Sequence, residues 1–256
     1  ETVDTQDVVS GIAVRLEARE QVAVNKVVEA GTLYNTGDAA RADGLLEITS
    51  YLDEIYLMDD ARATGVMDIE AHEALISRGD LSTSGDIFLD ATHGYVSLSG
   101  AVTGGEDIDI QAYTDLSSQE NVTAAGGLLF QSDTGQINVF GDAHAADSLT
   151  LTAFEGDIAN GSLANPDAKL SSDTSVEILT GNRALISNVF APDLKLDADD
   201  LVFLTDLDIS GASEVVAGAA MTIRNFQSGA QASFVAAGQV VLAEGLTVGG
   251  DLTVQS

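Results

Sequence analysis

The sequence predicts an all-β protein of the parallel β-solenoid class, with about 21 residues in each turn. Short segments in which apolar and polar residues alternate recur along the chain, as in strands that bury one face. Apolar residues make up 45% of the chain, aromatic residues only 5%, and 25 glycines accompany only 2 prolines. This composition is typical of many short strands that are joined by tight turns and packed by aliphatic side chains.

The spacing of the strand-like segments is the main observation. Two interleaved series of apolar residues open such segments, each with a step of about 21 residues. The first series is Leu45, Val66, Ile87, Ile108, Leu128 and Leu149, and the second is Ile55, Leu75, Val96, Leu116, Ile137 and Ile158. Two series with one period predict at least two strands in each turn. Equivalent strands would stack in parallel, and each turn would add roughly 4.8 Å along the axis.

The same pattern predicts the domain organisation. Residues 1–256 form one solenoid domain with a loop insertion near 160–168, where the sequence reads NGSLANPDA. A strand is expected at 12–16. The composition of segment 14–28 would also suit a helix, but its alternation favours strands. Because no basic-then-apolar signal opens the chain and a strand-like segment closes it, we expect a fragment of a longer protein.

The charge of the chain excludes some partners. A formal net charge of −31 arises from 41 acidic and 10 basic residues, and no Lys or Arg occurs between Arg78 and Lys169. Binding to nucleic acid is therefore unfavourable, and no apolar run is long enough for direct insertion into a membrane. The chain has no cysteine, so disulfides and thiolate metal sites are excluded. Salt would screen the self-repulsion of such a surface, which would suit a saline habitat.

Two aspartates one period apart are candidates for a cation site. Asp86 and Asp107 each directly precede a strand, and stacking would hold their carboxylates about 5 Å apart. Like charges at that distance repel, so a bound cation, protonation or salt screening would relieve them. Ca²⁺ is the natural hard partner for carboxylate oxygens, although the glycine-aspartate nonapeptide of calcium-binding β-rolls is absent. A solvated acidic face is the alternative interpretation.

Two of the three histidines, His72 and His93, also lie one period apart. Their side chains could stand above one another in consecutive turns and share a metal ion. The alternative is a bend position that tolerates a polar ring, because the flanking residues form no recognisable ligand set. Apart from these metal candidates, the sequence predicts no catalytic residue and no cofactor-binding residue.

Two stretches carry a resemblance to a known family. Residues 81–89 read LSTSGDIFL, and residues 147–158 read DSLTLTAFEGDI. They resemble the repeats of filamentous-haemagglutinin-like proteins, and the resemblance covers most of the chain. It implies a right-handed parallel β-helix that bacteria export through a dedicated outer-membrane partner. It also implies a role in adhesion, in biofilm formation or in the display of a distant effector domain.

The repeat and the resemblance together predict a structural or adhesive shaft of a bacterial exported surface protein, located outside the cell or on its surface. The expected partner is a glycan or protein on a host or neighbouring cell, or another copy of the chain along the solenoid axis. One alternative is a polysaccharide-active enzyme that uses paired carboxylates, but with 41 acids such pairs arise by chance, so we expect no enzyme. Another is a self-assembling extracellular filament subunit, since open solenoid ends expose unpaired strands.

Overall fold

The computed structural model describes residues 1–10, 13–31, 44–161, 165 and 167–256. Every regular element in these residues is a β-strand, and the strands form a parallel β-solenoid of about 12 turns with roughly 20 residues per turn. The β-solenoid predicted from the spacing is therefore confirmed. Ile12 of the expected strand at 12–16, and part of the expected insertion near 160–168, lie outside the described residues.

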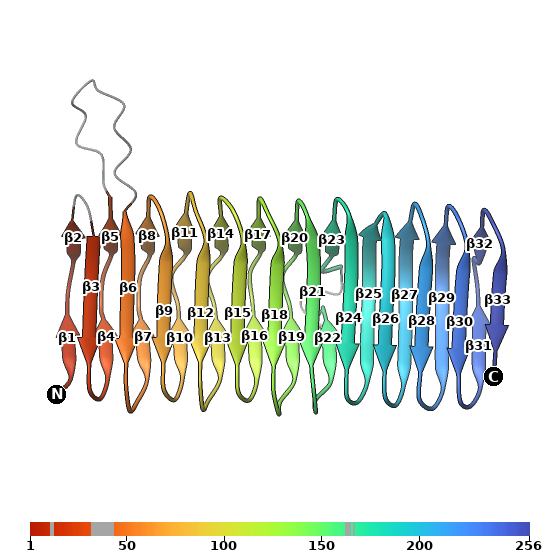
Figure 1. Ribbon diagram of the computed structural model, residues 1–256, viewed down its shortest axis with the longest axis horizontal. Helices are drawn as coiled ribbons and strands as arrows, with labels where there is room; N and C mark the ends of the chain where they lie inside the picture. Colours follow the sequence, from red (N-terminus) through yellow and green to blue (C-terminus); the bar gives the residue numbers. More distant parts are fainter. Residues whose placement is uncertain (11–12, 32–43, 162–164, 166) are drawn as a thin grey trace, which may run out of the picture. The chain divides into compact units, whose positions relative to one another are not determined.

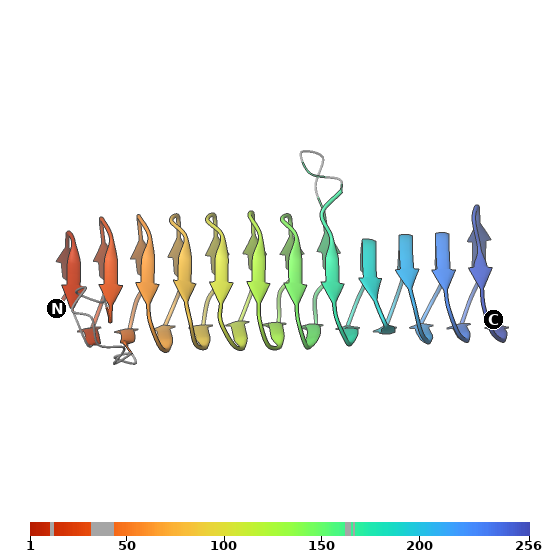
Figure 2. The ribbon, with the colours of Figure 1, turned by 90° about the horizontal axis from the view of Figure 1, so that it is seen from above.

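The chain divides into two compact units, Glu1–Gly126 and Gly127–Ser256. Within each unit the turns follow one another in sequence order, as Figure 1 and Figure 2 show from two directions. The sequence predicts one domain over residues 1–256, and the division into two units does not test that prediction.

Each turn of the first unit contributes three strands, which pair in parallel with the equivalent strands of the neighbouring turns. The long-strand stack comprises β3 (Ala13–Ala18), β6 (Leu45–Ser50), β9 (Met67–Ala71), β12 (Ile87–Ala91) and β15 (Ile108–Ala112). The first short stack comprises β1 (Val3–Thr5), β4 (Val22–Val24), β7 (Ile55–Leu57), β10 (Leu75–Ser77), β13 (Val96–Leu98) and β16 (Leu116–Ser118). The second short stack comprises β2 (Val8–Ser10), β5 (Val28–Ala30), β8 (Ala61–Ala63), β11 (Leu81–Thr83), β14 (Val102–Gly104) and β17 (Val122–Ala124). The strands β3, β4 and β5 confirm that segment 14–28 is not helical.

The second predicted series matches the register of the first short stack. Ile55 pairs with Leu75, Leu75 with Val96, and Val96 with Leu116, so successive members of the series lie directly above one another. In the second unit Ile137 pairs with Ile158, as the same series predicts.

The first predicted series is wrong by one position at its start. The structure pairs Leu46 with Met67 and Met67 with Ile87, whereas Leu45 and Val66 lie one position earlier and are only half-buried. The step from Met67 to Ile87 is one position shorter than the step from Leu46 to Met67, so a constant step overshoots here. Since successive side chains of a strand point to opposite faces, an error of one position replaces the inward residues Leu46 and Met67 by their outward neighbours Leu45 and Val66.

Inward aliphatic side chains fill the space between the three stacks of the first unit. In the long-strand stack Leu46, Met67, Ile87 and Ile108 follow one another in register and are almost completely buried. Burying one such side chain is worth roughly 1.5–3 kcal/mol relative to leaving it exposed. Because each turn repeats the same inward positions, every column is covered by the turns on either side.

The second unit begins with the same kind of turn and then changes. Its long-strand stack comprises β18 (Leu128–Ser132), β21 (Ser148–Ala153), β24 (Ser175–Thr180), β26 (Asp193–Ala198), β28 (Ser213–Ala217), β30 (Ala232–Ala236) and β33 (Leu252–Gln255). The remaining strands are β19 (Ile137–Val139), β20 (Ala143–Ala145), β22 (Ile158–Asn160), β23 (Leu170–Ser172), β25 (Ala184–Ala191), β27 (Val202–Ile209), β29 (Met221–Ser228), β31 (Val240–Ala243) and β32 (Thr247–Val248). The long strand β25 pairs with both β22 and β23, so that one bent strand takes the place of two short ones.

A single residue with left-handed backbone bends each of the strands β25, β27 and β29. Asn188, Asp206 and Asn225 have φ angles of 53°, 56° and 48°, and Glu244 has a φ of 50° between β31 and β32. Asparagine and aspartate adopt this conformation more readily than most residues because their short side chains bond locally. Since one residue replaces a longer corner, the turns that pair β25 with β27 and β27 with β29 take 18 and 19 residues, whereas those from β7 to β10, β13 and β16 take 20 or 21.

The register lengthens at the predicted insertion. His144 in β20 pairs with Ser171 in β23, so this turn is longer than its neighbours. The buried side chain of Asn160 supports the start of this segment. Its Nδ2 donates to the carbonyl oxygens of Ala168 at 3.0 Å and Ser187 at 2.7 Å, and its Oδ1 accepts the N–H of Ser187 at 2.7 Å.

Candidate functional site

The structure places Asp86 and Asp107 above one another, directly before β12 and β15. Oδ1 of Asp86 accepts a hydrogen bond from the backbone N–H of Asp107 at 3.1 Å, and the carbonyl oxygen of Asp107 accepts the N–H of Ile87 at 2.9 Å. The Asp86 carboxylate therefore connects one turn to the next. A Ca²⁺ ion at this pair stays a prediction.

The same connection recurs at other corners of both units. In each case an aspartate at the start of a strand accepts the backbone N–H of the equivalent residue one turn later, at 2.8–3.1 Å. The aspartates are Asp60, Asp80, Asp86, Asp142, Asp157 and Asp193. A hydrogen bond to an ionised acceptor is stronger than a neutral one, so these acids stabilise the stacking of turns.

Asp157 has an additional partner at its corner. Its Oδ2 lies 2.5 Å from Nη2 of Arg183, and the aspartate side chain is 17% exposed. Hydrogen bonds from the Arg183 guanidinium lower the pKa of the Asp157 carboxyl, against the opposing effect of burial. The same pairing raises the pKa of Arg183. The ion pair and the backbone bond act on the same carboxylate.

His72 and His93 do stack in consecutive turns. Their ring centroids lie 4.2 Å apart with an interplanar angle of 37°, and Nδ1 of His93 lies 3.1 Å from Oγ1 of Thr92. The ring of Tyr113 continues the row, 6.2 Å from that of His93. In the part of the chain that the structure describes, no three His, Cys, Asp or Glu residues converge as a metal ligand set. A metal ion shared by the two histidines stays a prediction.

Acidic residues form a column on the outward face of the long-strand stack in the first unit. Glu47, Asp68, Phe88 and Asp109 follow one another in register. Desolvation raises the pKa of Asp68, and the charges of Glu47 and Glu70 raise it further. Desolvation also raises the pKa of Asp109. The exposed ring of Phe88 lies between the two aspartates along the column.

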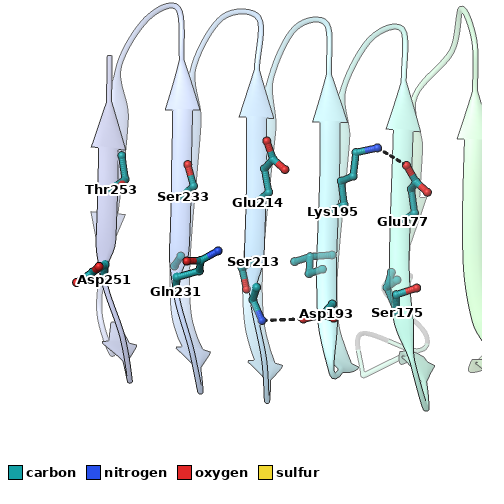
Figure 3. A pocket seen from close by; sticks show the side chains of 14 residues that line it. Ser175, Glu177, Asp193, Lys195, Ser213, Glu214, Gln231, Ser233, Asp251 and Thr253 are labelled. Carbon is teal, nitrogen blue, oxygen red and sulfur yellow. Dashed lines mark hydrogen bonds and ion pairs between the residues drawn. The ribbon is translucent and has the colours of Figure 1, made fainter.

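A hollow of about 610 Å³ lies on the outward face of the long-strand stack in the second unit (Figure 3). Glu177, Lys195, Glu214, Ser233 and Thr253 come from five successive strands and form one row across it. Nζ of Lys195 lies 2.5 Å from Oε1 of Glu177, and this bond and the nearby acids raise the pKa of Lys195. The row thus offers alternating charges and hydroxyl groups to a polar ligand.

The structure also brings together a histidine and a serine that the sequence reasoning missed. Nδ1 of His144 lies 3.1 Å from Oγ of Ser171, and both line a second hollow of about 460 Å³ together with Phe190 and Asp208. The two residues are in register in β20 and β23. They escaped detection because the insertion lies between them and sets them further apart along the chain than one repeat period.

Comparisons with known proteins identify no relative of this chain. No protein family, no curated protein and no solved structure matches this chain. The fold itself is that of a β-helix repeat protein. The resemblance to filamentous-haemagglutinin-like proteins stays a prediction. Among the described residues there is no helix with the length and apolar character needed to span a membrane.

Proposed function

We propose that this chain is a structural and adhesive shaft of a bacterial exported surface protein. The observation that carries the proposal is the joining of turn to turn by corner aspartates. Asp60 binds the N–H of Asp80, and Asp80 in turn binds the N–H of Ala101, so that carboxylates reinforce the backbone ladders. Six of the 41 acidic side chains thus help to hold a regular scaffold together.

Two sequence features support a position outside the cell. A net charge of −31 keeps a protein soluble and discourages non-specific binding to nucleic acid. The resemblance to exported repeat proteins points in the same direction. On this proposal the partners are glycans or proteins on neighbouring surfaces, and the repeated outward faces provide the contacts.

Surface exposure and attachment test the proposal. Antibodies raised against the purified chain should label intact, unpermeabilised cells that produce it. Beads coated with the chain should attach to surfaces that carry glycans or proteins of neighbouring cells, more than albumin-coated beads do. Labelling that requires permeabilised cells, or attachment equal to that of albumin, would argue against a surface adhesin.

A second candidate function, polysaccharide hydrolysis, is favoured by the column that contains Asp68, Phe88 and Asp109. Two strand spacings separate the aspartates by roughly 9.6 Å. This is close to the separation of about 6.5–9.5 Å between the carboxyl groups of inverting hydrolases. A raised pKa suits a carboxylic acid that donates a proton, and an exposed ring can stack on a sugar.

Release of reducing ends from neutral and acidic glycans tests this second function. Hydrolysis by the pair predicts that Asp68→Asn and Asp109→Asn each abolish the release, whereas Asp90→Asn on the same face does not. Release that survives both changes, or no release from any glycan, would exclude the pair as an active site.

A further inference from the structure

Four bends of the first unit gather rings and carboxylates at one corner. They comprise residues 51–54, 72–74, 92–95 and 113–115, and each follows a strand of the long-strand stack. These bends lie along the lower edge of Figure 1. Backbone hydrogen bonds connect them, for example from the N–H of His93 to the carbonyl oxygen of His72 at 2.8 Å. We call these four bends the aromatic-acidic strip.

The strip concentrates the aromatic residues of a chain that is poor in them. It holds three of the five tyrosines and two of the three histidines of the whole sequence. Tyr51, Tyr95 and Tyr113 are 56%, 41% and 43% exposed, so their rings do not serve the core. His72, His93 and Tyr113 form a continuous row, with centroids 4.2 Å and 6.2 Å apart. Exposed rings that gather in this way mark an interaction surface.

Carboxylates accompany the rings. The first bend contains Asp53 and Glu54, the second contains Glu73 and the fourth contains Asp115, while no Lys or Arg occurs in any of the four. The hydroxyl of Tyr56, next to the first bend on β7, donates to the carboxylate of Glu54. This bond and burial raise the pKa of Tyr56 to about 12, so the phenol keeps its proton. The strip therefore presents rings and negative charge together.

This combination selects for cations. Aromatic faces attract ammonium groups through the ring quadrupole, and neighbouring carboxylates add direct charge attraction. Three of the four bends contain both a ring and a carboxylate, and the bends succeed one another at roughly 4.8 Å. A fitting ligand therefore repeats an apolar face and a positive charge at a similar interval. Side chains on one face of an extended basic peptide repeat at about 6.8 Å, which fits the interval less well.

We propose that the aromatic-acidic strip binds a polymer of amino sugars, whose pyranose rings pack on Tyr51, the histidine pair and Tyr113 while their ammonium groups face the acids. Each sugar of such a polymer has an apolar C–H face and one amine, and successive sugars follow at a spacing close to that of the turns. The inference rests on the proposed adhesive function, for which it names the ligand class.

Calorimetric titration of the purified chain with a β-linked glucosamine hexamer tests the proposal, in slightly acidic buffer of physiological salt. The double variant Tyr51→Ser/Tyr113→Ser keeps the net charge, and we expect it to bind the hexamer at least about tenfold more weakly than the unchanged chain. The matched control Phe190→Ser/Phe203→Ser removes two exposed rings outside the strip. It should bind within about twofold of the unchanged chain.

The charge contribution needs its own pair of variants. Glu73→Gln/Asp115→Asn should weaken binding of the hexamer, whereas Glu155→Gln/Asp173→Asn removes the same charge elsewhere and should not. Circular dichroism of all four variants should match that of the unchanged chain, since the altered side chains are exposed.

Several results would overturn the proposal. They are equal affinity of the ring variant and the unchanged chain, no binding of the hexamer, or equal binding of the neutral N-acetylglucosamine hexamer. Tighter binding of hexalysine would assign the strip to a basic peptide instead. Because the titration uses purified protein, its outcome is independent of whether intact cells display the chain, so the strip and the proposed surface function can fail separately.

Discussion

At the scale of single residues, the position of a carboxylate decides whether its charge stabilises the fold. Asp157 accepts bonds from Arg183, and its pKa is lowered. Asp68 lies on a face with Glu47 and Glu70, and its pKa is raised. A lowered pKa means that folding favours the charged form, and a raised pKa means the opposite. The two aspartates therefore predict opposite responses to substitution and to pH.

Asp157→Ala should lower the free energy of unfolding by about 1 kcal/mol at neutral pH, because an ion pair and a backbone acceptor are lost. The ordinary pKa of this carboxyl is 3.8 and the folded value is lower, so the stabilisation is present above pH 3.8 and is lost as the pH falls through the folded value. Urea unfolding at neutral and strongly acidic pH measures both effects, with Glu155→Ala as an exposed control. A loss of equal size at both pH values would contradict the assignment.

Asp68→Asn should raise the free energy of unfolding at neutral pH by roughly 0.5 kcal/mol, after solvent screening of a surface charge. The penalty of the ionised carboxylate is complete above its raised folded pKa and disappears below the ordinary value of 3.8, so the gain should vanish in acid. Thermal unfolding at the two pH values measures the gain. A gain that persists in acid would point to a cause other than charge.

At the scale of elements, the left-handed bends determine how many strands one turn contains. In the first unit, corners of several residues separate the two short stacks, whereas Asn188 in β25 joins the equivalent segments in one strand. The amide of Asn225 also donates to Oδ1 of Asp206 in the preceding turn at 2.8 Å, so the bends support one another. Glu244 occupies the same column with a side chain that does not favour this backbone.

Glu244→Gly should therefore raise the free energy of unfolding by about 0.5–1 kcal/mol, because glycine adopts a positive φ without steric cost. Glu244→Gln removes the charge but keeps the strain, and it should leave stability nearly unchanged. Urea unfolding of the three proteins separates strain from charge. If both variants were stabilised equally, charge rather than backbone conformation would explain the gain.

At the scale of the whole molecule, excess negative charge opposes the compact state. The net charge of −31 is spread over both units, and the described ion pairs engage few of the 41 acids. Repulsion between exposed charges falls within a Debye length, which is about 10 Å at 0.1 M salt and about 3 Å at 1 M. Salt should therefore relieve the repulsion among the outward columns.

The midpoint of thermal unfolding should rise by several degrees between dilute buffer and about 1 M NaCl. Calorimetry over a series of NaCl concentrations measures the shift, and sucrose at matched osmolality controls for effects that are not ionic. An unchanged midpoint would remove the physical support for adaptation to a saline habitat.

Much of the fold could be predicted because the signal is local and repeated. Strands such as β7, β10 and β13 each show the alternation in a few residues, and stacking repeats it at nearly constant intervals. The stacking of His72 on His93 followed from the same interval. The row that includes Tyr51 and Tyr113 carries the same signal, since each of these residues directly follows a strand of the long-strand stack.

By itself the sequence determined the class of fold, the parallel stacking and the outward position of the acids, because inward and outward residues alternate with a period of two in every strand. Only the tertiary structure decided the register at Leu46, the bends at Asn188 and Asp206, and the contact between His144 and Ser171. The physical reason is the length of the corners. One residue more or less in a corner changes which residues of the next strand lie in register with the preceding turn. The length of a corner depends on its backbone conformation, and that conformation depends on packing against the neighbouring turns.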